Sequence, residues 1–233
     1  MKIYGGLNLD DWYRKELTEE SYKELIKLTK WCNTILGYHP VIIGGWAVFH
    51  YSKSLGSRDI DIVFPTQKTR EDTLMRYYRE NGYKQEGLFV KHYYKEVNTK
   101  DGIERIILDA CTHSNENFLH ENPKIIIPWN LTEKYYEEWN IEDGVISRIP
   151  QIELLIIYKI KALCDRRYDL QKPSTAGLDR EYITSKIWKD EHDIHELFKQ
   201  DINRGLLKEL LKSTNFYDNA KREIDRLKIK IDV

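Results

Sequence analysis

Two neighbouring stretches of this chain decide its fold: residues 41–48 read VIIGGWAV, and residues 56–63 read GSRDIDIV. The first is a short β-branched run that ends abruptly in two glycines, which predicts a strand leading directly into a helix. The second has strand-like alternation, which places Asp59 and Asp61 on one face and the isoleucines on the other. The isoleucines can enter the core, so we expect the two carboxylates to stand side by side in a cleft.

The predicted pair of carboxylates indicates a cation-binding site. Two like charges at close range are costly unless something positive lies between them. Mg²⁺ and Mn²⁺ are hard divalent ions that prefer oxygen ligands, so either would suit Asp59 and Asp61.

The two glycines favour a phosphate site. A strand that passes through Gly44 and Gly45 into a helix leaves backbone N–H groups unpaired and not covered by any Cβ. Such a turn can approach a phosphate closely, and the helix N-terminus favours its negative charge. A phosphate site and a metal-binding carboxylate pair are thus expected about 15 residues apart, which describes a site for a metal–nucleotide.

A third carboxylate is predicted at Asp109, the one charge within the apolar run 106–110. Burying it without a partner would be expensive. If its strand neighbours that of Asp61, Asp109 completes a cluster able to bind a second metal, or it takes the proton from an attacking hydroxyl.

The fold class expected from the whole chain is α/β, with a small mixed β-sheet flanked by helices and a helical C-terminal domain. The elements outward from the central stretches are a helix over 19–36 ended by Gly37, a helix from 69 to about 82, strands over 88–97 and 103–113, and a further short apolar segment at 124–128. The expected domains are 1–130 with the N-terminal helix, a connecting region 131–150, and helical residues 151–233.

Composition excludes several classes of protein. The 233 residues carry 37 basic and 38 acidic side chains, and the net charge of -1 gives no global argument for binding nucleic acid or an anionic membrane. The three cysteines are far apart and fit a reducing cytoplasm better than a disulfide framework or a zinc site. No apolar run approaches the ~20 residues that span a bilayer, and the first residues lack the apolar core of a signal peptide. We therefore expect a cytoplasmic protein with no membrane partner.

Gly44-Gly45 followed by Ser57-x-Asp59-x-Asp61, and later Asp109, resembles the nucleotidyltransferase superfamily of DNA polymerase β. The resemblance covers roughly residues 40–112. It implies a minimal α/β fold that transfers NMP from an NTP and releases pyrophosphate. The Gly-Gly-Trp-Ala turn is also similar to that of the aminoglycoside and lincosamide nucleotidyltransferases.

The C-terminal part resembles the AbiEii-type abortive-infection toxin nucleotidyltransferases. The residues that carry this are Lys159-x-Lys161-Ala162-Leu163, the following Arg166-Arg167, and Lys189-Asp190-x-x-Asp193. The resemblance implies that Lys159 contacts nucleotide phosphates and that Asp190 and Asp193 belong to the nucleotide-facing wall. The chain departs from these toxins at Leu55, where they usually have an arginine, although Arg58 lies nearby.

The expected activity is metal-dependent transfer of NMP from an NTP to a hydroxyl acceptor. The acceptor stays open between RNA or tRNA, a protein and a small hydroxylated molecule, and a toxin role would add an antitoxin partner. The alternatives are an antibiotic nucleotidyltransferase and a non-catalytic nucleotide-binding module. Asp59, Asp61 and Asp109 are the expected catalytic and metal-binding residues. The expected nucleotide-binding residues are Gly44, Gly45, Ser57, Arg58, Lys159, Asp190 and Asp193.

Overall fold

Strands from both halves of residues 41–150 form one mixed seven-stranded sheet in the computed structural model, in the order β3-β4-β5-β2-β1-β7-β6. The strands are β1 (Val41–Ile43), β2 (Ile60–Phe64), β3 (Lys84–Glu86), β4 (His92–Thr99), β5 (Gly102–Thr112), β6 (Tyr136–Glu142) and β7 (Val145–Pro150). The structure describes residues 15–86, 92–100, 102–173 and 177–230.

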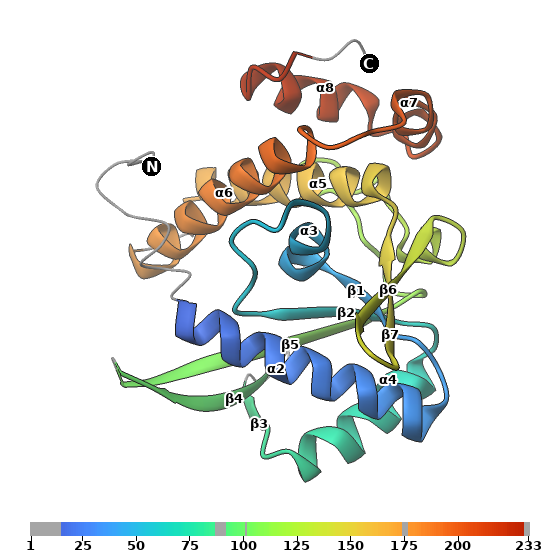
Figure 1. Ribbon diagram of the computed structural model, residues 1–233. Helices are drawn as coiled ribbons and strands as arrows, with labels where there is room; N and C mark the ends of the chain where they lie inside the picture. Colours follow the sequence, from blue (N-terminus) through green and yellow to red (C-terminus); the bar gives the residue numbers. More distant parts are fainter. Residues whose placement is uncertain (1–14, 87–91, 101, 174–176, 231–233) are drawn as a thin grey trace.

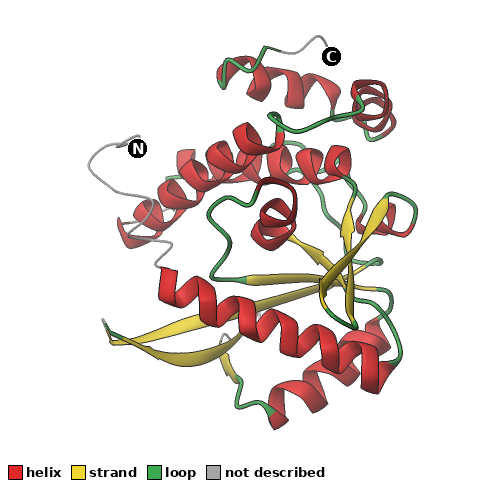
Figure 2. Cartoon of the chain, viewed as in Figure 1, coloured by secondary structure: helices red, strands yellow, loops and turns green. Residues whose placement is uncertain are grey.

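Four of the described helices follow the last strand in the chain. Figure 2 shows helices, in red, above and below the strands of the sheet, in yellow. The described helices are α2 (Lys15–Trp31), α3 (Gly44–Ser52), α4 (Gln67–Thr73), α5 (Ile152–Gln171), α6 (Gly177–Leu197), α7 (Arg204–Ser213) and α8 (Tyr217–Arg226), with short π-helical turns at Cys32–Leu36 and Leu74–Tyr78 and a 3-10 turn at Trp129–Glu133. No helix in the described part of the chain is long and apolar enough to cross a membrane. The expected α/β class is confirmed.

Helix α3 occupies a central place in the fold. It contacts β1 and β2 on one side and α5 and α6 on the other, so it lies between the sheet and this helix pair (Figure 1). Helices α7 and α8 pack against α5, while α2 crosses the sheet and contacts β4, β5 and β7. The residues at the start of α3 are therefore held by both the sheet and the C-terminal helices.

One hydrophobic core joins the sheet to the C-terminal helices. Ile60, Ile62 and Leu108 from the sheet are fully buried in the same cluster as Leu155 and Ile194 from α5 and α6. Such continuity means that the C-terminal helices are fixed in place against the sheet by buried apolar surface, the dominant favourable contribution to folding.

Residues 131–150, expected as a connecting region, contain β6 and β7. Strand β7 extends the sheet by a parallel pairing with β1, in which Val41 lies opposite Arg148. The proposed domain boundary itself stays a prediction.

The apolar segment 124–128 and the expected strand 88–97 need comment. Segment 124–128 forms no strand of the sheet, because its backbone bonds locally: Leu119 N–H donates to Ile125 O and Ile127 N–H to Asn117 O. The predicted strand 88–97 appears as β4 from His92, and residues 88–91 lie outside the described part of the chain.

Candidate active site

Strand register brings the predicted carboxylates to one face of the sheet. Asp61 on β2 lies opposite Asp109 in the parallel neighbour β5 and opposite Ile43 in the antiparallel neighbour β1. Residues directly opposite each other point to the same face. The flanking Ile60 and Ile62 are buried on the other face. Asp61 is partly buried and Asp109 is exposed, so the acidic face opens toward solvent at β5.

The same register brings the start of α3 against Asp61. Because Ile43 lies opposite Asp61, the next residue, Gly44, begins the helix directly at this carboxylate. Gly44 has φ +66°, and a Cβ at this position would lie 2.0 Å from Asp61 Oδ2. A Cβ on Gly45 would lie 2.8 Å from Ser57 Oγ. Only glycine allows this contact between a helix N-terminus and the acidic residues.

Asp59 precedes β2 and is held from two sides. Its backbone N–H donates to Ser57 Oγ at 3.3 Å, and its Oδ2 accepts a hydrogen bond from Lys186 Nζ at 2.6 Å. Arg58 Nε lies 3.8 Å from the other oxygen, Oδ1. Within the described residues, this Oδ1 is buried and has no hydrogen-bond partner.

Crowding of the carboxylates changes the acidity of Asp61. Burial, together with the negative charges of Asp109 and Asp59, raises its pKa from 3.8 to about 7, while Lys159 and Lys186 oppose the rise. Near neutral pH, a cation that binds beside this carboxyl group therefore displaces its proton into solvent.

The raised pKa of Asp61 predicts a pH dependence of stability. The folded protein binds the Asp61 proton more tightly than the unfolded chain does. Protonation of Asp61 therefore contributes to the free energy of unfolding, fully below about pH 4, and this contribution is lost as pH rises through about 7. Asp61→Asn cannot ionise. We expect the difference in free energy of unfolding between Asp61→Asn and wild type to favour the variant by about 2–3 kcal/mol more at pH 8 than at pH 5. Urea denaturation at the two pH values measures it, and an advantage that is equal or smaller at pH 8 would contradict the assignment.

A charged stripe on α6 faces the acidic residues. Lys186, Lys189, Asp190 and Asp193 follow the spacing i, i+3, i+4, i+7 that places side chains on one helix face. Three of its four members form a buried stripe, in which Asp193 is fully covered and Asp190 and Lys189 are nearly so, while Lys186 is partly buried. Lys159 Nζ of α5 lies 2.7 Å from Asp193 Oδ2 and 3.3 Å from Asp190 Oδ1.

The charges of the stripe compensate one another. Lys189 pairs with Asp193, and Arg166 of α5 pairs with Asp190. Burial lowers the pKa of Lys189 to about 8, with Asp193 opposing. Burial alone would raise the pKa of Asp193, but Lys159 and Lys189 lower it overall. This arrangement keeps Asp193 ionised and Lys159 fixed in position.

The oxygen donors fit a hard divalent cation in part. The buried Asp59 Oδ1 has no hydrogen-bond partner among the described residues, and an Asp61 oxygen lies against the glycine turn. Carboxylate oxygens are what Mg²⁺ and Mn²⁺ prefer. As they stand, however, no three His, Cys, Asp or Glu side chains in the described chain are grouped closely enough to hold a metal. The ligand roles of Asp59, Asp61 and Asp109 stay predictions.

The structure brings most of the predicted site residues together. Gly44, Gly45, Ser57, Arg58, Asp59, Asp61 and Asp109 lie around the end of β1 and β2. Lys159 acts electrostatically on Asp61, whereas Asp190 and Asp193 contact basic side chains. The sequence analysis missed Lys186, and it quoted Lys189 in a motif without giving it a role. The readable signal was that charged residues occupy the helical spacing normal for buried apolar residues.

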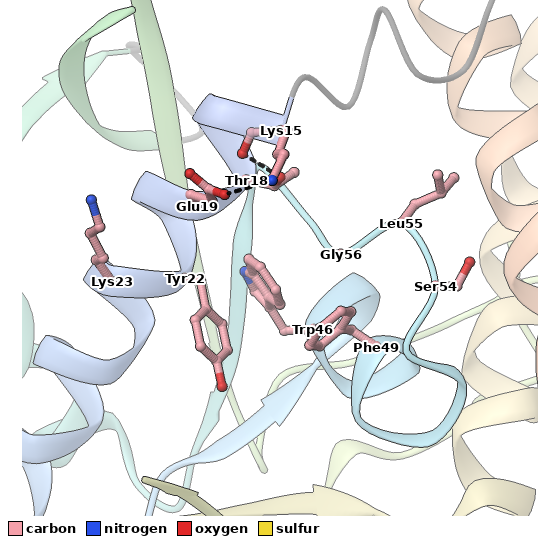
Figure 3. A pocket seen from close by; sticks show the side chains of 10 residues that line it. All are labelled: Lys15, Thr18, Glu19, Tyr22, Lys23, Trp46, Phe49, Ser54, Leu55 and Gly56. Atoms are coloured by element: carbon pink, nitrogen blue, oxygen red, sulfur yellow. Dashed lines mark hydrogen bonds and ion pairs between the residues drawn. The ribbon is translucent and has the colours of Figure 1, made fainter.

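A separate pocket lies beside this site, between α2, α3 and the loop 53–56 (Figure 3). It encloses about 530 Å³, and the rings of Tyr22, Trp46 and Phe49 point into it. None of the three site carboxylates lines it. Trp46 is only 3% exposed and donates from Nε1 to Ser21 Oγ at 3.2 Å, as a packing residue beneath the glycine turn would.

The chain has a structural likeness among known proteins. No family model matches the chain, and no curated protein matches it. Among solved structures, the chain is similar to the solution structure of the antibiotic-resistance factor ANT(2'')-Ia, at 13% sequence identity and a TM-score of 0.39, over 86% of this chain and 97% of the other. A likeness of this degree bears on neither the activity nor the substrate of this protein.

Proposed function

We propose that this protein is a metal-dependent nucleotidyltransferase that transfers NMP from an NTP to a hydroxyl acceptor and releases pyrophosphate. The observation that supports it most is the contact of the α3 N-terminus with a carboxylate, at Gly44 and Asp61. The backbone N–H groups at the start of α3 can bind phosphate, and the carboxylate oxygens of Asp61 can bind a divalent cation. The two groups are in contact with each other. A nucleotide triphosphate with its metal needs both.

The residues divide between the metal and the phosphates. Asp59 and Asp61 would hold Mg²⁺ or Mn²⁺, which when bound supplies neutralisation of the triphosphate charge. The turn of Gly44 and Gly45, together with Ser57, binds the β and γ phosphates through backbone N–H and hydroxyl groups.

The basic residues extend the phosphate-binding surface from the helical side. Lys159 is fixed by Asp190 and Asp193 and lies close enough for its charge to act on Asp61. It would contact the phosphates as a positioned point charge, and Arg58 would add a second positive charge beside Asp59.

Asp109 serves the acceptor. Because it is exposed while its register partner Asp61 is partly buried, it is the carboxylate that an incoming hydroxyl can reach. It accepts the hydroxyl proton as the oxygen attacks the α-phosphorus; the new P–O bond forms, the bond to the β-phosphate oxygen breaks, and pyrophosphate leaves. Positioning supplies most of the rate.

The proposal predicts a labelled product. Incubation with each α-³²P-labelled NTP and Mg²⁺, in the presence of total RNA, a protein mixture or a panel of hydroxylated antibiotics, should transfer label to one of the three pools and release pyrophosphate. Chelation by EDTA should stop the transfer. Nucleotide binding without transfer to any pool would instead support a non-catalytic nucleotide-binding module.

The labelled pool also decides the acceptor class. Label in RNA would support a toxin-like enzyme, whose expression should arrest growth and be countered by an antitoxin. Label in a hydroxylated antibiotic would support a resistance enzyme. The nearly balanced charge of the chain favours a small or locally bound acceptor over a nucleic acid held along its whole length.

A further inference from the structure

Lys186 occupies the acidic site from the helical side. Its Nζ donates to Asp59 Oδ2 at 2.6 Å, across 127 residues of sequence, and its charge acts on Asp61. The side chains of Lys186 and Asp59 are 17% and 13% exposed, so water screens this ion pair little. An ammonium group thus already neutralises one of the two carboxylates expected to bind a metal.

Lys186 differs from the other two lysines of the cleft in how it is held. Lys159 contacts two buried carboxylates, and Lys189 is buried and pairs with Asp193 on its own helix. Lys186 reaches Asp59 from a more exposed part of α6. Release of Lys186 therefore leaves the ion pairs of Lys159 and Lys189 in place.

The Lys186 ammonium, while bonded to Asp59, also lies near an aromatic ring one helical turn away. Its Nζ lies 5.4 Å from the ring centroid of Tyr182, a side chain that is 49% exposed. A cation within about 6 Å of an aromatic face is attracted to it. We expect that a rotation of the lysine side chain toward this ring and solvent would release Asp59 without movement of α6.

We propose that Lys186 is a built-in counterion for Asp59, which a divalent metal must displace before it can use both oxygens of that carboxylate. The inference rests on the proposed function. It adds that the protein itself supplies a cation, Lys186, that competes with the metal for Asp59. Two cations on one carboxylate repel each other. Metal entry therefore drives Lys186 outward, toward Tyr182 and the space where the triphosphate is expected.

The size of the effect follows from competition. If Asp59 is free of Lys186 in about one molecule in ten, the apparent affinity for metal is about tenfold below the intrinsic affinity. Lys186→Met removes the competing charge and keeps most of the length of the side chain. We expect the variant to bind Mn²⁺ about tenfold more tightly than wild type in the absence of nucleotide. Titration at pH 8.5, where Asp61 is ionised, followed by the EPR signal of free Mn²⁺, measures this without any assay of activity.

Two variants control for general electrostatics. Arg58→Gln also removes one positive charge beside Asp59, but Arg58 Nε lies 3.8 Å away and leaves Oδ2 to Lys186. It should raise Mn²⁺ affinity clearly less than Lys186→Met, and Lys186→Arg should stay near wild type. Equal gains in Lys186→Met and Arg58→Gln, or no gain in Lys186→Met, would overturn the counterion role.

The wild-type protein offers a test that needs no variant. Displacement by Mn²⁺ should make the Lys186 amine more reactive toward acetylation, read by mass spectrometry, while buried Lys189 serves as the internal reference. Unchanged Lys186 labelling upon metal binding would overturn the inference and leave the proposed function standing. Absence of Mn²⁺ binding in both wild type and Lys186→Met would remove the proposed metal site itself.

Discussion

Asp61→Asn is expected to lower nucleotidyl transfer by roughly a thousandfold, the scale at which loss of one preorganised electrostatic group affects a reaction centre. The substitution keeps the shape of the side chain and removes the charge that faces Asp109 across the β2–β5 pairing. It also removes the carboxylate that lies against Gly44. The fold should survive, because the amide does not carry the unfavourable ionisation that burial and the neighbouring acids impose on Asp61. Loss of activity with gain of stability is the expected signature of a functional charge.

The measurement is the release of pyrophosphate under saturating Mg²⁺ and NTP. Asp72→Asn is a matched control, since this exposed carboxylate pairs with Lys68 on the surface of α4 and faces no part of the site. It should retain wild-type turnover. If Asp61→Asn kept more than about a tenth of that turnover, a direct role of Asp61 in binding the metal would be untenable.

Gly44→Ala is expected to damage both the fold and the site. The new methyl group would overlap Asp61 Oδ2 at 2.0 Å, and the φ of +66° adds strain for any residue with a Cβ. A left-handed conformation costs about 1–2 kcal/mol in a non-glycine residue, and overpacking adds about 1–3 kcal/mol. We expect a loss of about 3 kcal/mol in the free energy of unfolding.

Gly37→Ala separates the two causes. Gly37 has nearly the same φ, +69°, but no atom lies within 4 Å of its added Cβ. Its substitution should show the backbone strain alone, about 1–2 kcal/mol, with normal turnover. Transfer by Gly44→Ala should fall at least about a hundredfold, because small misplacements of reacting groups carry such a cost. Equal stability and equal activity in the two variants would mean that the approach of the α3 N-terminus to Asp61 has no importance.

The sheet side of the site could be predicted because its information is local. Alternation through Asp59 and Asp61, and the glycines at the end of a β-branched run, specify side-chain direction within a few residues. Asp109 required one further assumption, that its strand neighbours β2, and the parallel register bears this out.

The helical side of the site could not be derived in the same way. Lys186 reaches Asp59 only because α5 and α6 pack on α3, and nothing local to residue 186 encodes that approach. Strand β7 was missed for a similar reason: it pairs with β1 across more than 100 residues of sequence. The apolar segment 124–128 was misleading in the opposite sense, since local bonds to residues 117–119 satisfy its backbone.

The buried stripe of α6 constrains how this protein can vary. Removal of one member, such as Asp193, leaves Lys159 and Lys189 buried with less compensation, and breaking a buried ion pair typically costs about 3–5 kcal/mol. A saturation mutagenesis screen would therefore score these positions as intolerant whether or not they touch a nucleotide. Only paired replacements, in which a lysine and its aspartate change together, would separate the needs of folding from those of catalysis. Sequence drift at this face should accordingly proceed by coupled steps, with unstable single substitutions lying between them.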